Sequence, residues 1–362
     1  MKLKGRIFPT IFFVLSVFLL LYTFYKSEVV WKGTRINYYT LYYLLGLILL
    51  VSSIFIFFIN YKIREYFFII FLSFLSTLYI FEFYLNSIES IIISKIYKDR
   101  TGEKFDEREK FEIYSDLKKN DESVVLNVAP VFHLTNNKLI PLSGVSNSQT
   151  IHCNENGYYS IYQSDRYGFN NPDSEWDQKE IEYLTLGDSF VQGSCVNRPN
   201  DITSVLRTLS NKSALNLGYG GNGPLLQYAG LREYLSKKVN KVVWVYFEGN
   251  DLINLNNELE SRILNYYLDN QNFSQDLKNK QKKIDDINNF AIEKEFKRLK
   301  ERNFSNKLNI LKLSKVRTTL YNYIPEKYKP KPQPRPKPSK KFYEVLALAK
   351  NLAIKNNSKF YF

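Results

Sequence analysis

The first hundred residues alternate between long apolar runs and short charged connections. The runs cover residues 7–25, 38–59 and 67–85, and each approaches the roughly 20 residues that a helix needs to cross the hydrocarbon core of a bilayer. Tyrosine and tryptophan stand near the ends of the runs, as in an interfacial aromatic belt. The pattern predicts a membrane region over residues 1–97 with about three transmembrane helices. A shorter apolar stretch, 88–96, is expected either to extend the third helix or to lie along the interface.

Lys2, Lys4 and Arg6 precede the first run, and no small-residue cleavage site follows it. This favours an anchor over a cleaved signal peptide. Three crossings put the two ends of the chain on opposite sides of the membrane, and the positive-inside rule then places the N-terminus in the cytoplasm. We therefore expect an integral membrane protein whose polar part is extracytoplasmic, in the periplasm of a bacterium. The other connections carry similar numbers of lysines and arginines, so the margin is small.

The polar part begins with a charged stretch, residues 98–122, which we expect to be a linker or stalk. Residues 123–179 predict a small β-rich lead-in, because short apolar runs alternate there with Asn, Gly and Ser. The expected strands of the lead-in are Ser123–Val128, Lys138–Leu142 and Tyr158–Tyr162.

From about residue 180 the pattern changes to strands that alternate with helices. The expected strands are Ile181–Leu186, Ala214–Leu217 and Lys241–Phe247, with helices near Asp201–Leu209 and Leu225–Lys237 between them. Such alternation predicts parallel βαβ units, and continuous apolar runs indicate strands buried on both faces. The fold class is therefore α/β, with a doubly wound parallel sheet over residues 180–362, preceded by the all-α transmembrane region. Within it, residues 256–303 are expected to form a charged helical insertion, of which residues 278–300 are expected to lie outside the core, and residues 325–338 an extended Pro-rich spacer.

Composition limits the partners of the chain. The formal net charge is +14, which in a membrane-anchored protein favours attraction to anionic lipid headgroups. We expect no nucleic-acid partner, because no basic stripe coincides with a binding motif. The two cysteines, Cys153 and Cys195, are too few for a zinc site, so they form either one disulfide or two buried thiols. No metal and no cofactor is expected.

A polar, glycine-containing loop follows each of the three expected strands of the main domain. The loops are Gly187-Asp188-Ser189, Asn216-Leu-Gly-Tyr-Gly-Gly-Asn-Gly-Pro224 and Glu248-Gly249-Asn250-Asp251. Glycine permits tight turns and close approach of backbone N–H groups to a ligand. Ligands of open α/β sheets bind at the carboxyl ends of the strands, so we expect the loops to form one site. Ser189, at the start of the next helix, is the candidate nucleophile.

The three loops, in this order, resemble the motif blocks of the SGNH/GDSL hydrolase superfamily. The resemblance covers about residues 180–362 and implies a flavodoxin-like sheet on which Ser189 attacks an ester carbonyl. The oxyanion would be held by the N–H of Ser189, the N–H of Gly221, with Gly220 as the near alternative, and the side chain of Asn250. The residues implied to support these groups are Gly187, Asp188, Gly249 and Asp251.

A serine nucleophile also needs a base. The family takes it from an Asp-x-x-His motif near the C-terminus, which does not occur here. The two histidines, His133 and His152, both precede Ser189, and we expect them to be ordinary packing or surface residues. The base is therefore not present in this chain. The expectation is that the sequence is C-terminally truncated and has little esterase activity as it stands.

The expected function is that of a membrane-anchored serine esterase or acyltransferase. The resemblance implies acyl esters, such as acetyl esters of cell-envelope or exported polysaccharide, as substrates, and an envelope polysaccharide-assembly protein as a further partner. The alternatives are a non-catalytic glycan-binding or scaffold protein on a hydrolase-derived fold, or an inert fragment. Asp165, Arg166 and Asn170 of the lead-in either brace the nucleophile loop or meet substrate, or form a structural Asp–Arg turn network.

Overall fold

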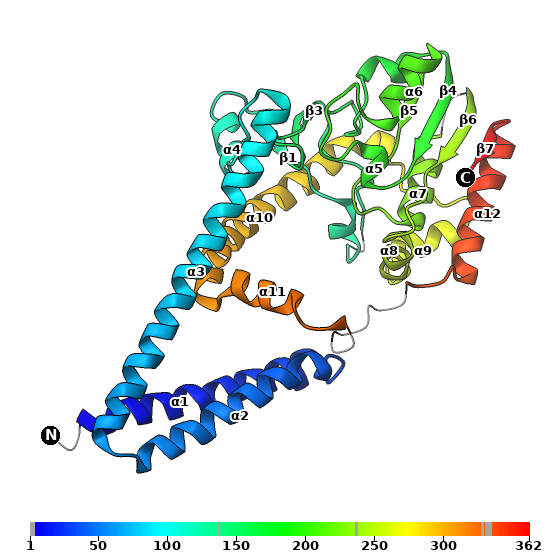
Figure 1. Ribbon diagram of the computed structural model, residues 1–362. Coiled ribbons are helices and arrows are strands. Elements are labelled where there is room, and N and C mark those ends of the chain that lie inside the picture. Colours follow the sequence, from blue (N-terminus) through cyan, green and yellow to red (C-terminus); the bar gives the residue numbers. More distant parts are fainter. Residues whose placement is uncertain (1–3, 137, 236–237, 327–328, 330–334) are drawn as a thin grey trace. The chain divides into compact units, whose positions relative to one another are not determined.

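The computed structural model describes residues 4–136, 138–235, 238–326, 329 and 335–362 (Figure 1). The chain divides into two compact units. The first combines Met1–Ile93 with Ser305–Pro334, and the second combines Ser94–Phe304 with Arg335–Phe362. The expected Pro-rich spacer, 325–338, lies in part outside the described residues.

The three predicted apolar helices form, and they belong to the first unit except for the third helix beyond Ile93. They are α1 (Lys4–Phe24), which continues into a π-helical turn (Tyr25–Val30), α2 (Ile36–Phe58) and α3 (Tyr61–Thr101). All three are long and apolar enough to cross a membrane, which confirms the expectation. Because α3 continues to Thr101, the stretch 88–96 extends the third helix and does not form a separate interfacial segment. The same unit holds a 3-10 helix (Leu308–Lys312) and α11 (Ser314–Asn322).

The second unit opens with α4 (Lys110–Lys118) and a three-stranded sheet. Its strands are β1 (Val125–Leu126), β2 (Gln149–Ile151) and β3 (Ile161–Gln163), with β1 parallel and β3 antiparallel to β2. The expected strand at residues 138–142 does not form. A side chain takes the place of a partner strand there, because Gln275 accepts from the Ile140 N–H (2.8 Å) and donates to its carbonyl (3.2 Å).

The main sheet of the second unit is parallel throughout. It has the order β5-β4-β6-β7, with β4 (Glu180–Leu186), β5 (Ala214–Asn216), β6 (Lys238–Trp244) and β7 (Lys359–Tyr361). The helices that connect these strands include α5 (Ser189–Gln192), α6 (Ile202–Ser210), α7 (Pro224–Tyr234) and α12 (Lys340–Lys355). Leu184 pairs with Leu215 and with Val242, and all three side chains are buried. The predicted α/β class with a parallel sheet is therefore confirmed.

The charged segment after β6 was expected to lie outside the core, but part of it is buried there. It forms α8 (Asp251–Glu258), α9 (Arg262–Asp269), a 3-10 helix (Leu277–Lys280) and α10 (Gln281–Lys307). Tyr267, Leu277 and Ile284 are fully buried in the main core. Residues 284, 288 and 292 of α10 are all buried, and their spacing of four places them on one face of the helix. One narrow apolar face is enough to dock α10, although charged residues dominate its composition.

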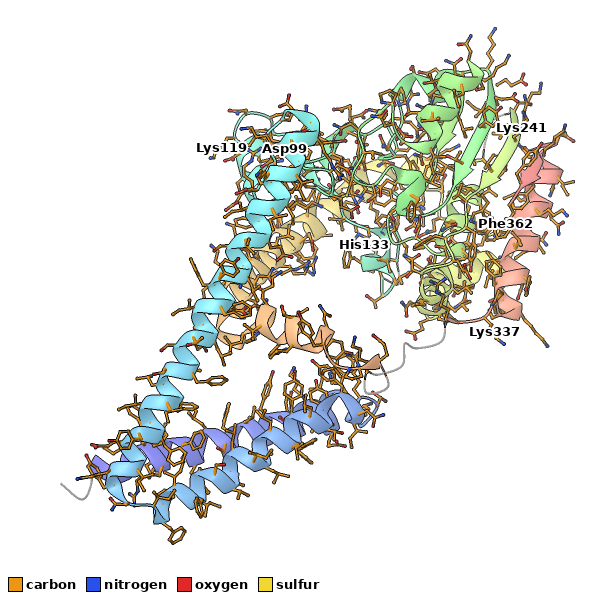
Figure 2. The ribbon with its side chains drawn as sticks, viewed as in Figure 1. Asp99, Lys119, His133, Lys241, Lys337 and Phe362 are labelled. Carbon is orange, nitrogen blue, oxygen red and sulfur yellow. A yellow bond between two sulfur atoms is a disulfide. The ribbon has the colours of Figure 1, made fainter. Side chains whose placement is uncertain are left out.

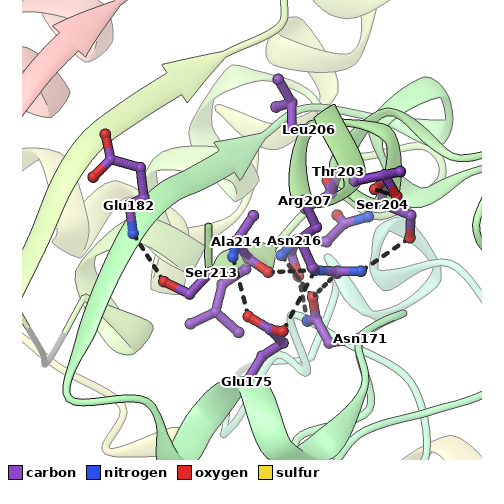
Figure 3. Close-up of polar contacts among 12 residues, drawn as sticks. Asn171, Glu175, Glu182, Thr203, Ser204, Leu206, Arg207, Ser213, Ala214 and Asn216 are labelled. Carbon is purple, nitrogen blue, oxygen red and sulfur yellow. Dashed lines mark hydrogen bonds and ion pairs between the residues drawn. The ribbon is translucent and has the colours of Figure 1, made fainter. Parts of the chain in front are cut away.

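Side chains cover the outer edge of β5, where no further strand pairs among the described residues (Figure 3). The Ala214 N–H donates to Glu175 (3.0 Å), and its carbonyl accepts from Arg207 (2.9 Å). The Asn171 amide bonds both backbone groups of Asn216, at 2.8 and 2.9 Å. An exposed edge strand invites pairing with another chain, and this network blocks it while it holds β5 in place beneath the site.

Candidate functional site

The loops after β4, β5 and β6 lie together at one edge of the sheet. The Tyr219 N–H donates to the Gly187 carbonyl (3.3 Å), and the Val245 N–H donates to the Leu186 carbonyl (2.9 Å). The hydrogen bonding of β4 with β5 on one side and with β6 on the other therefore continues beyond the ends of the strands. The structure brings the three predicted motifs to a single place, as the parallel order of the strands requires.

Ser189 is the first residue of α5 and is half-buried. Asp188 caps this short helix, since its carboxylate accepts from the Phe190 N–H at 2.9 Å. A Cβ atom on Gly187 would lie 2.4 Å from the Val191 side chain and 3.0 Å from the Val245 carbonyl. Only glycine fits there, and the tight turn that it permits presents Ser189 at the end of β4.

The Gly220 amide is already used by a neighbouring side chain. Gln192 is fully buried and accepts from the Gly220 N–H at 2.7 Å. Its side-chain amide donates to Asn127 (2.8 Å) and to the Tyr162 hydroxyl (2.9 Å). A Cβ on Gly220 would lie 3.7 Å from the Ser189 Cβ, so the glycine loop is next to the serine.

Gly221 differs from Gly220 in having an uncommitted amide. No hydrogen bond of the Gly221 N–H is found among the described residues, whereas its carbonyl accepts from Asn254 at 3.3 Å. Its φ of +78° lies in the left-handed region that favours glycine. Of the two glycines considered as oxyanion donors, Gly221 is the one with an N–H to offer.

Asn250 lies at the N-cap position of α8 and is half-buried. Its side-chain oxygen has no hydrogen-bond partner among the described residues. Phe247, earlier in the same loop, packs against Phe190 of α5 with ring centroids 4.7 Å apart. A Cβ on Gly249 would lie 2.6 Å from the Phe247 ring, so glycine is needed for this packing. The ring pair is 54% and 38% exposed and forms an apolar surface beside Ser189.

Two buried carboxyls, Asp188 and Asp251, stand below these loops. The pKa of Asp251 is raised to about 7, chiefly by burial and in smaller part by the nearby Asp188 carboxyl, while the Phe247 N–H opposes the shift. That N–H donates to Asp251 at 2.9 Å. Burial also raises the pKa of Asp188. Because both pKa values are raised, each carboxyl stays protonated to a higher pH than a free aspartate does.

Glu258, at the end of α8, fixes the far end of the glycine loop. It is fully buried and accepts from the N–H groups of Gly223 (2.5 Å), Leu225 (2.9 Å) and Leu226 (3.4 Å). It thus caps the N-terminus of α7. Burial raises the pKa of Glu258 to about 8, although the three N–H groups favour the ionised form.

Neither histidine is hydrogen-bonded to Ser189 in the described part of the chain. His152 Nε2 lies 3.4 Å from the Ser194 hydroxyl, and burial lowers the pKa of His152 to about 3. His133 ends a 3-10 helix (Pro130–His133) near Asn288, and burial lowers its pKa as well (Figure 2). Both imidazoles are packing groups, which leaves the Ser189 hydroxyl with no imidazole beside it.

Cys153 and Cys195 form a disulfide, which decides between the bridge and the two thiols that the sequence left open. The Ser194 N–H, one residue before the bridge, donates to the Ser189 carbonyl at 2.9 Å. The lead-in is thus covalently joined to the segment that follows Ser189.

Two of the three lead-in residues brace the loops. Asn170 donates to the Gln192 carbonyl at 2.8 Å. Asp165 is fully buried and accepts from four donors: the N–H groups of Tyr167 and Phe169 and the side chains of Asn171 and Trp176. Arg166 faces away and pairs with Asp173 and Asp177, both at 2.7 Å. The expected Asp–Arg turn network therefore involves other aspartates than Asp165.

A cavity of about 620 Å³ lies between residues 128–136 and the 283–298 face of α10. Phe132 and Phe290, each 59% exposed, contribute aromatic surface to it, and the ammonium of Lys294 lies 4.3 Å from the Phe290 ring. The same segment reaches the glycine loop, because a Cβ on Gly221 would lie 3.3 Å from Val131. This cavity could not be predicted from the sequence, since its two walls are about 150 residues apart along the chain.

Comparison with protein-family models, with curated proteins and with solved structures gave no match for the chain. Among the described residues no group of three or more His, Cys, Asp or Glu side chains is placed to hold a metal ion. What the site can do therefore has to be argued from its own geometry.

Proposed function

We propose that the protein is a membrane-anchored serine esterase or acyltransferase of the SGNH type. The observation that carries the proposal is the placement of Ser189 at the start of a helix after β4, beside Gly220 of the glycine loop, in which the N–H of the following Gly221 has no partner among the described residues. The sheet order also supports it. When the four strands of the main sheet are numbered 1 to 4 along the chain, the sheet order β5-β4-β6-β7 becomes 2-1-3-4. This matches the first four positions of the flavodoxin-like order.

In this proposal the Ser189 hydroxyl attacks an acyl carbonyl, and its proton passes to a base. The developing oxyanion is held by the N–H groups of Ser189 and Gly221 and by the Asn250 side chain. The base is the missing part, because no imidazole contacts Ser189 in the described residues. We therefore expect slow turnover by this chain, and faster turnover when imidazole is added to the solution.

The surroundings of Ser189 support an acylated glycan as the substrate. The exposed Phe190–Phe247 pair offers an apolar surface for an acyl group such as acetyl. The cavity between residues 128–136 and α10, with its aromatic and cationic walls, has room for sugar units further along a polymer, and Val131 of the first of these segments lies against Gly221. Three candidate membrane spans and a disulfide favour a substrate at the cell envelope, since disulfides persist in oxidising compartments.

The test uses the full chain in detergent, with p-nitrophenyl acetate and an acetylated polysaccharide as substrates, with and without imidazole. We expect acetate release that Ser189→Ala abolishes, and covalent labelling of Ser189 by a fluorophosphonate. Ser194→Ala is the matched control, because Ser194 lies in the same loop but contacts His152 and Cys153. Acetate release that survives Ser189→Ala would remove Ser189 from the mechanism.

A second candidate is a non-catalytic envelope protein that binds glycans on a hydrolase-derived fold. The lack of an imidazole at Ser189 favours it. It predicts binding of acetylated polysaccharide that Ser189→Ala leaves intact, together with no acetate release and no fluorophosphonate labelling even when imidazole is supplied.

A further inference from the structure

After α10 the chain returns to the unit of apolar helices. Residues 305–334 belong to that unit. The hydroxyl of Tyr79 on α3 donates to the Leu311 carbonyl at 3.0 Å. Three residues later on α3, the buried Glu82 carboxylate accepts from the N–H groups of Lys315 (3.0 Å) and Val316 (2.8 Å), in the first turn of α11.

Two further contacts hold α11 in the same unit. The Lys315 ammonium pairs with Glu89 on α3. At the other end of α11, the Tyr321 ring lies 6.3 Å from Tyr38 in the first turn of α2. The segment is thus attached to α3 at its start and to α2 near its end.

These attachment points lie where the helices would leave a bilayer. Glu65, in a charged cluster with Lys62 and Arg64, precedes Glu82 by 17 residues on α3. At about 1.5 Å per residue this separation is about 25 Å, close to the roughly 30 Å of a hydrocarbon core. Tyr38 is one of the aromatic residues at the start of the second span, where an interfacial belt is expected.

The surface of the segment is both apolar and cationic. Leu311, Leu320 and Tyr323 are 65%, 61% and 83% exposed. Residues 305–325 contain four lysines and arginines and no acidic residue, and residues 305–338 contain nine against a single acidic residue, Glu326. Exposed apolar side chains together with an excess of Lys and Arg are typical of segments that lie in the headgroup region of a membrane.

We propose that residues 305–325 form an interfacial segment that binds the surface of an anionic bilayer. Leu308, Leu311, Leu320 and Tyr323 enter the headgroup region, and Lys307, Lys312 and Arg317 bind anionic lipid headgroups. Lys315 is already paired with Glu89 and serves as an anchor. The chain then leaves the membrane for the second unit after Ile93 and returns to it at Ser305. This inference does not depend on the proposed chemistry of Ser189.

The test places a fluorescent NBD label on single cysteines in the full chain, reconstituted in nanodiscs of phosphatidylcholine with or without phosphatidylglycerol. The native cysteines are bonded to each other and do not react. Labels at Leu311→Cys and Leu320→Cys are expected to shift to the blue and to be quenched by brominated lipids. The matched control is Tyr343→Cys, 59% exposed on α12 in the second unit, where quenching by aqueous iodide is expected instead.

A second variant tests the charges. Replacing Lys307, Lys312 and Arg317 together by Gln should weaken the membrane-bound state only in the anionic nanodiscs, by up to roughly fivefold for each cation removed. Iodide quenching at positions 311 and 320 equal to that at 343 would overturn the proposal. Lipid quenching that is the same in both nanodiscs and unaffected by the triple substitution would overturn the anionic-lipid part of it.

Discussion

Asn250 offers the clearest separation of catalysis from stability at the residue scale. Its side chain is at a helix N-cap but makes no cap hydrogen bond, so little of the fold depends on it. As an oxyanion donor it would act only when charge develops. We expect Asn250→Ala to lower kcat for p-nitrophenyl acetate, measured with added imidazole, by roughly 10²–10³.

The free energy of unfolding of this variant should stay within about 0.5 kcal/mol of the wild type, as for most surface substitutions. Asn256→Ala on the same helix is the control, because Asn256 is exposed and should leave both quantities unchanged. An unaltered kcat in Asn250→Ala would exclude Asn250 from the oxyanion site.

Asp251 should make stability depend on pH in a sense opposite to that of most carboxylates. Its pKa is about 7 in the folded protein, against about 3.8 when unfolded, so the folded state binds more protons between these values. The contribution of Asp251 to the free energy of unfolding therefore falls as pH rises from about 4 to about 7 and then levels off.

Asp251→Asn cannot titrate, so its profile over this range should be flatter than that of the wild type, with a difference of up to a few kcal/mol. Some slope will remain, because the pKa values of Asp188 and Glu258 are also raised. The measurement is chemical denaturation of the full chain at a series of pH values. Parallel profiles for the two proteins would contradict the expectation.

At the scale of elements, the Cys153–Cys195 bridge joins the lead-in to the loop that carries Ser189. The bridge closes a chain segment of 42 residues, and such closures stabilise proteins by about 2–4 kcal/mol. We expect reduction, or the double replacement of both cysteines by serine, to lower the free energy of unfolding by that amount. Reductant should have no effect on the double variant, which separates loss of the bridge from other effects of the reagent.

Arg207 is the cation that closes the edge of β5. It donates to the Ala214 carbonyl (2.9 Å), to Ser204 (3.0 Å) and to Asn171 (3.3 Å), a fork that lysine cannot reproduce (Figure 3). We expect both Arg207→Lys and Arg207→Ala to reduce the free energy of unfolding by roughly 1–3 kcal/mol, because buried acceptors lose their donor. Lys212, which is exposed nearby, provides the control substitution Lys212→Ala. Equal stability of Arg207→Lys and wild type would show that charge alone suffices at this edge.

At the scale of the whole molecule, the sequence predicted those features that depend on local pattern. The three apolar helices and the βαβ alternation followed from runs of apolar residues, and the loops after the strands could be located from glycine-containing turns. It could not predict which amide of the glycine loop is free, because that depends on Gln192, which is distant from Gly220 in sequence. It also placed α10 outside the core, because its one apolar face is narrow and charges surround it. Both of these features depend on contacts between segments that are distant in the sequence.

Two signals bear on the side of the membrane on which the second unit lies. Lys2, Lys4 and Arg6 favour a cytoplasmic N-terminus, but the nine cations of residues 305–338 belong to the opposite side of the three spans. The positive-inside rule counts charges in short loops near the spans, and long domains cross largely regardless of their charge. Residues 305–338 follow the third span by about 200 residues, so they carry little weight under this rule. The disulfide then favours an oxidising, extracytoplasmic compartment.

We therefore expect a membrane-impermeant maleimide to label Tyr343→Cys in intact cells, because position 343 is exposed in the second unit. The matched control is Lys62→Cys, exposed at the start of α3 on the other side of the third span, which should be labelled only after permeabilisation. Cys153 and Cys195 should be oxidised in the same cells, as measured by a gel shift after alkylation. The reverse labelling pattern with reduced cysteines would place the site in the cytoplasm, and extracytoplasmic polysaccharide could then not be its substrate.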